Sequence, residues 1–119
     1  MSPNLVIDLA ANPDVRVRVD AFSVPEAARA ELEVAMHRSA AFLATLPGYR
    51  GHVAFERVGG PSRFDIVTVA AWESAEAAEA AGVRVRAYYE GIGFDVREAL
   101  ERWGVTAERG DYRAPASLQ

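Results

Sequence analysis

The chain has 119 residues, half of them apolar and a quarter charged, which is typical of one soluble globular domain. Its net charge of −4 argues against a nucleic-acid-binding surface, because such surfaces are normally basic. The sequence contains no Cys, and all 13 basic residues are Arg, so disulfides, thiolate nucleophiles and Schiff-base lysines are excluded.

His37 and His52 are the two imidazoles, too few for a His-rich metal site, and there is no Gly-rich phosphate loop. We therefore expect no metal and no other cofactor. The N-terminus lacks the basic and then apolar pattern of a secretion signal, and no apolar run is long enough to cross a membrane. The expected location is the cytoplasm, with no membrane partner.

Residues 1–13 and 114–119 are expected to flank the single domain as an N-terminal arm and a polar tail. The arm contains the apolar run 5–7 before the breaker Asn12-Pro13, which fits either an extra edge strand or a loose segment. The first clear strand follows, because residues 14–22 alternate between two sets of side chains.

Asp20 stands out on this strand, on the same face as Arg16, Arg18 and Phe22. The face turns apolar at Phe22, so Asp20 lies where the strand enters covered territory. A carboxylate in that position is either a solvated edge charge or a residue of a site.

A helix is expected next, because Ser23 and Glu26 have the spacing of a capping box. It should run to about Leu46, where the Pro-Gly pair at 47–48 ends it. Its apolar residues form a stripe, and His37 falls on the wet side, so His37 is expected at the surface.

Two strands then form an expected hairpin, since residues 49–58 alternate, 59–62 are turn residues, and a β-branched run begins at Arg63. His52 is the only imidazole on an expected strand. It is either an ordinary histidine or the proton-transfer group of a site.

The run from Arg63 to Ser74 is the stretch around which the chain is organised. Both of its faces are apolar, which predicts a central strand covered on both sides. Trp72 ends it, either as a packing residue or as the wall of a pocket, and Ser74 offers an N-cap oxygen to the next helix. One face carries Val67, Val69 and Ala71, and the other carries Phe64, Ile66, Thr68, Ala70 and Trp72.

The C-terminal third predicts a broken helix. Helix is expected over 74–81 and 83–90, with Gly82 interrupting it and a second break at 91–93, so that it forms a kinked cover over the sheet. Tyr88 and Tyr89 point in different directions on such a helix, so at most one faces a pocket. Another helical stretch, 94–103, and a last strand, 105–113, complete the chain.

The element order βαββαβ predicts an α+β, ferredoxin-like domain with an antiparallel sheet and its helices on one face. The other face of the sheet is also apolar. A homodimer formed by packing two sheets together, with the last strand around Tyr112 contributing, would bury it.

Three segments together resemble the antibiotic biosynthesis monooxygenase family: Asp20–Pro25, Leu46–Tyr49 and Arg63–Ala77. The similarity spans residues 15–112. It implies a dimeric α/β barrel with a pocket between sheet and helices, and cofactor-free oxidation of phenolic polyketides to quinones by O2. Trp72 matches the strand-end tryptophan of the family.

The sequence departs from the patterns of two groups in this family. Members that act on anthrone-like substrates have an Asn four residues before the Trp and a Tyr six after it, where this chain has Thr68 and Ala78. Heme-degrading relatives have an Asn in place of Asp20 and a histidine ligand near Gly82. The resemblance therefore favours an oxygenase of small aromatic molecules and not heme degradation.

An electron-rich phenolate or enolate can reduce O2 by itself in a dry pocket that supplies a base and hydrogen bonds. Asp20 or His52 is the expected base, and Trp72 with Tyr88 or Tyr89 would orient an aromatic substrate. Phe22, Phe64 and Thr68 complete the expected substrate-binding residues. The same groups would serve a non-oxidative polyketide cyclase or isomerase, or a non-catalytic small-ligand-binding module. Of these readings, the oxygenase ranks first.

Overall fold

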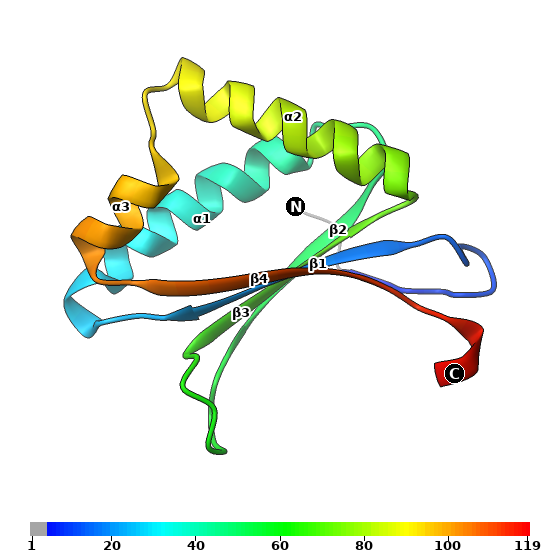
Figure 1. The fold of residues 1–119 in the computed structure, drawn as a ribbon, viewed down its shortest axis with the longest axis horizontal. Helices are drawn as coiled ribbons and strands as arrows, with labels where there is room; N and C mark the ends of the chain where they lie inside the picture. Colours follow the sequence, from blue (N-terminus) through cyan, green and yellow to red (C-terminus); the bar gives the residue numbers. More distant parts are fainter. Residues whose placement is uncertain (1–4) are drawn as a thin grey trace.

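A computed structural model describes residues 5–119 and has the ferredoxin-like fold that the element order predicts (Figure 1). Four strands form one antiparallel sheet in the order β2-β3-β1-β4, and the three helices lie together on one side of it. The elements are β1 (Arg16–Ser23), η1 (Glu26–Ala28), α1 (Arg29–Leu43), β2 (Tyr49–Glu56), β3 (Ile66–Trp72), α2 (Ala75–Gly91), α3 (Val96–Trp103), β4 (Thr106–Arg113) and η2 (Ala116–Leu118).

The expected central strand is confirmed as β3, which is hydrogen-bonded to β2 on one side and to β1 on the other. Its hairpin with β2 is also confirmed, although β2 ends at Glu56 and leaves Val58 fully exposed in the loop. Of the N-terminal arm, residues 1–4 lie outside the described residues, and Leu5–Ile7 form no strand.

The predicted capping box at Ser23 is wrong. Ser23 is the last residue of β1 and pairs with Thr106, and the long helix begins only at Arg29, without a side-chain cap. The backbone N–H of Val24 instead donates to Oδ2 of Asp65 at 2.7 Å. A carboxylate 41 residues away has thus replaced the local partner, and this contact keeps the chain extended past Ser23.

The predicted helix break at Gly82 is also wrong, because α2 runs without interruption from Ala75 to Gly91. Its N-cap is Ser74, as expected, and the hydroxyl oxygen of Ser74 accepts from the backbone N–H of Ala77 at 3.1 Å. Most neighbours of Gly82 are strong helix formers, so one glycine costs too little to end the helix. The second break, at residues 92–93, is present.

The sheet face opposite the helices carries apolar side chains on every strand. Val53, Val69 and Val19 form one row across β2, β3 and β1, because the strand register pairs each with the next. Phe55 and Tyr112 lie on the same face and are 56% and 58% exposed. No helix lies over this face within residues 5–119 (Figure 1).

Candidate active site

The strand register sets the polar residues of the helix-covered face side by side. In antiparallel sheets, directly paired residues point to the same face. Asp20 on β1 pairs with Thr68 on β3 and with Arg109 on β4, so these three side chains form a row. In the neighbouring row, Arg18 pairs with Ala70, and Ala70 pairs with His52 on β2.

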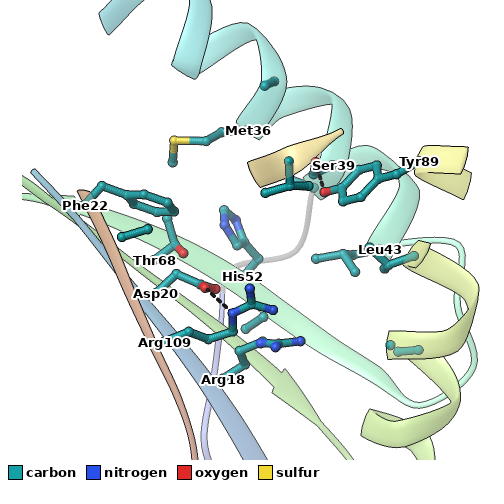
Figure 2. A pocket seen from close by; sticks show the side chains of 18 of the residues that line it. Arg18, Asp20, Phe22, Met36, Ser39, Leu43, His52, Thr68, Tyr89 and Arg109 are labelled. Atoms are coloured by element: carbon teal, nitrogen blue, oxygen red, sulfur yellow. Dashed lines mark hydrogen bonds and ion pairs between the residues drawn. The ribbon is translucent and has the colours of Figure 1, made fainter. Parts of the chain in front are cut away.

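A cavity of about 350 Å³ lies between this face and the helices (Figure 2). Its polar side chains come mostly from the sheet, whereas the helices contribute mainly apolar ones. The sheet supplies Arg18, Asp20, Phe22, His52, Thr68, Trp72 and Arg109, and the helices supply Leu32, Met36, Ser39, Leu43, Val85 and Tyr89, among others. Such a cavity suits an aromatic ligand that carries a few oxygens.

Six of the eight residues selected from the sequence line this cavity: Asp20, Phe22, His52, Thr68, Trp72 and Tyr89. Phe64 does not line it, since it precedes β3 and lies under the guanidinium of Arg63, 4.8 Å from its ring centre. Tyr88 also lies outside the lining and stacks on Phe42, with the ring centres 4.2 Å apart.

Asp20 is the one carboxylate in the lining. Burial raises the pKa of its carboxyl, and the positive charges of Arg18 and Arg109 act against this effect. Nε of Arg109 lies 3.5 Å from Oδ1 of Asp20, close enough for an ion pair. A carboxylate with a raised pKa is a stronger base than an exposed aspartate, and it remains ionised at neutral pH.

His52 lines the same cavity from β2. Burial lowers the pKa of its imidazole, the charge of His37 lowers it further, and Asp20 acts in the opposite direction. Its ring is therefore neutral at pH 7 and has a free lone pair, so it can also accept a proton. Figure 2 shows His52 and Asp20 projecting from the sheet into the same cavity.

Trp72 closes one end of the cavity, where it is 4% exposed. Tyr49 packs edge-on against it, with ring centres 5.7 Å apart, and this contact holds the indole ring in place. On the helix side, the hydroxyl groups of Tyr89 and Ser39 are 2.5 Å apart and hydrogen-bonded (Figure 2). That bond ties α2 to α1 across the top of the cavity.

The sequence reasoning did not select Arg18 and Arg109 as site residues. The alternation of β1 places Arg18 on the face of Asp20, so that signal was present in the sequence. Arg109 had no such signal, because it reaches Asp20 only through the register of β1 with β4, two strands that are far apart in the chain.

The donor groups do not form a metal site in the part of the chain that the structure describes, where no three His, Asp or Glu side chains gather closely enough to bind an ion. In residues 5–119, every helix is also too short or too polar to span a membrane.

Comparison with known proteins gave matches among solved structures alone, since no family model and no curated protein matches the sequence. SnoaB, a cofactor-independent oxygenase from Streptomyces nogalater, is 28% identical over 88% of this chain and 97% of its own, with a TM-score of 0.63. The heme-degrader MhuD from Mycobacterium tuberculosis is 25% identical over 83% of this chain and 94% of its own, with a TM-score of 0.59.

A protein described as an antibiotic biosynthesis monooxygenase from Deinococcus radiodurans has a TM-score of 0.63 over 87% of this chain and 96% of its own. At 15% identity, it shows the fold alone. Together these structures confirm the resemblance to the antibiotic biosynthesis monooxygenase family and the ferredoxin-like fold.

Proposed function

We propose that this relative of the antibiotic biosynthesis monooxygenases is a cofactor-independent oxygenase that oxidises a phenolic aromatic molecule, such as a polyketide, with O2. The observation that carries the proposal is the cavity itself. It places a carboxylate and a neutral imidazole on the floor of a largely apolar space that an aromatic molecule would fill. The similarity to SnoaB over most of both chains supports the same chemistry.

The reaction needs a base and a dry site. The base removes a proton from the bound phenol or enol, and the electron-rich anion then reduces O2 and combines with it to form a peroxide on a ring carbon. Loss of water from the peroxide leaves a quinone carbonyl. One oxygen atom enters the product and the other leaves as water, so the substrate supplies all the electrons.

Asp20 and His52 are the two proposed bases, since each lines the cavity with a pKa shifted toward this role. Thr68, directly beside Asp20, has a hydroxyl that can donate to the developing oxyanion. Trp72, Phe22 and Tyr89 would hold the aromatic rings and exclude water, because their side chains form the apolar part of the wall.

The likeness to MhuD raises heme degradation as a second function, which the cavity favours less. The resemblance places the histidine ligand of heme-degrading relatives near Gly82. The residues of α2 that line the cavity are Ala78, Ala81, Gly82, Val85 and Tyr89, and none of them is an imidazole.

We also propose that the protein is a homodimer in which two copies pack through the open faces of their sheets. The valine row and the exposed rings of Phe55 and Tyr112 form a continuous apolar surface that a second copy would cover. A two-fold arrangement suits this surface, because each copy presents the same face to the other.

Oxygen uptake tests the proposed reaction. With 1,8-dihydroxyanthrone as the probe, the protein should consume one O2 for each anthraquinone formed, at a rate well above the spontaneous oxidation. An Asp20→Ala, His52→Ala double variant is the matched control and should return the rate to the spontaneous one. Turnover of a phenolic polyketide that continues unchanged without O2 would reject the oxygenase and favour a cyclase or isomerase.

A further inference from the structure

Arg18 has an unused hydrogen-bond donor in the cavity. Its Nε atom is buried and donates to no residue within the described part of the chain. Its nearest acid is Asp111, with Nε and Oδ1 3.8 Å apart, and the side chain of Asp111 is 72% exposed. A buried guanidinium N–H without an acceptor is costly, so a ligand oxygen that accepted from it would bind favourably.

The charges that line the cavity do not cancel. Arg18 and Arg109 carry two positive charges, Asp20 carries one negative charge, and His52 is neutral at pH 7 because burial lowers its pKa. The helices add no charged side chain to the lining. The cavity therefore has an excess positive charge, and a partly buried excess charge favours a ligand of opposite sign.

The two arginines are not equivalent. Arg109 already faces Asp20, at 3.5 Å between Nε and Oδ1, whereas Arg18 pairs weakly with an exposed carboxylate at the rim. Figure 2 shows both guanidinium groups on the floor of the cavity, below His52. Arg18 is thus the group whose charge remains available to a ligand.

We propose that the natural ligand is an aromatic anion and that Arg18 holds its negatively charged oxygen. This inference rests on the function proposed above, since it names the chemical class of that substrate. Two kinds of oxygen share this chemistry. One is a carboxylate elsewhere on the aromatic skeleton, and the other is the phenolate that reacts with O2. A planar guanidinium suits either one.

Binding measured under argon tests the proposal apart from turnover, using two probes of nearly the same shape. We expect 1-naphthoate to bind at least about tenfold more tightly than the neutral 1-naphthamide, as for a charge-assisted hydrogen bond. Arg18→Gln should remove this preference and leave the affinity for the amide within about twofold of the original. Arg50→Gln, at an exposed arginine that pairs with Glu73 outside the cavity, should keep the preference.

The phenolate arm uses 2-naphthol, whose absorbance reports its ionisation. If Arg18 holds the reacting oxygen, bound 2-naphthol should ionise at a pH about one unit below that of the free compound, a tenfold change in its acid constant. Arg18→Gln should remove this shift too. A charge preference in one arm alone supports the proposal and identifies the oxygen as carboxylate or phenolate.

Two further measurements keep the test decisive if Arg18→Gln does not fold. Arg18→Lys retains the charge and should retain part of the preference. In the unaltered protein, salt should weaken the binding of 1-naphthoate but not that of 1-naphthamide. Equal binding of charged and neutral probes in both arms, or a preference that survives in Arg18→Gln, would overturn the proposal. Oxygen uptake with the anthrone would then still stand as evidence for the oxygenase.

Discussion

Oδ1 of Asp20 lies 3.5 Å from Nε of Arg109 on the cavity floor, yet burial raises the pKa of the Asp20 carboxyl despite this pairing. Desolvation therefore outweighs the attraction of the arginines for the charged form. The site keeps a carboxylate that the folded protein would hold more easily as the neutral acid. Such a group costs stability at neutral pH and gains basicity.

The first prediction concerns this cost. Because the pKa of Asp20 is raised above its ordinary value of 3.8, its contribution to stability is fully present below that pH and is lost as pH rises through the folded-state pKa. Asp20→Asn removes the ionisation and should raise the melting temperature at pH 7, with the gain shrinking toward pH 4. Thermal unfolding across this range measures the difference. A loss of stability at pH 7 would contradict the pKa direction.

The second prediction identifies the base. Of Asp20→Ala and His52→Ala, the variant that removes the base should lose about 10²–10⁴-fold in kcat/KM. If His52 is the base, activity should fall as pH drops through its pKa, which lies below 6.5. If Asp20 is the base, the fall should come at a pH above 3.8 and persist in His52→Ala. His37→Ala, at an exposed imidazole on α1, is the control and should keep its activity at pH 8.

The third prediction concerns Trp72. The change Trp72→Phe keeps most of the ring volume against Tyr49 and removes the indole N–H, so the fold should survive while turnover falls. Thermal unfolding and kcat are the two measurements. A variant that unfolds at a much lower temperature, with a normal kcat when folded, would make Trp72 a packing residue only.

The fourth prediction compares two glycines. A Cβ at Gly82 would contact nothing within 4 Å, so Gly82→Ala should stabilise α2 by about 0.5–1 kcal/mol. Gly48 has φ +80°, and a Cβ there would lie 2.5 Å from Cβ of Ala77, so Gly48→Ala should destabilise the protein by more than about 1 kcal/mol. Urea unfolding of both variants measures the contrast. Equal effects would mean that neither environment is as described.

The fifth prediction tests the assembly. Sedimentation at micromolar concentration should show a dimer, and Phe55→Glu or Tyr112→Glu should shift it toward a monomer by placing a charge on the open face. Both side chains are more than half exposed in the single chain, so the monomer should still fold. Val58→Glu, at a fully exposed loop position, is the control and should leave the dimer intact. A stable monomer of the unaltered protein would reject the proposed dimer.

Local patterns in the sequence were enough to predict the fold. The alternation of β1 and β2, the doubly apolar run of β3 and the Ser74 N-cap each depend on residues close together in the chain, and all are present in the structure. Local patterns failed where a distant partner or the length of a helix mattered. Asp65 takes the N–H that a capping box would have used, and α2 is long enough to pass through Gly82.

The composition of the site was only partly within reach of the sequence. Period-two alternation places Arg18, Asp20 and Phe22 on one face of β1 and Thr68 and Trp72 on one face of β3, because side chains on a strand point alternately to its two sides. Only the tertiary structure decided that Arg109 faces Asp20, that Tyr89 and not Tyr88 reaches the cavity, and that Phe64 stays outside it. The physical reason is that strand register and helix packing depend on the whole buried core, and no local pattern carries that information.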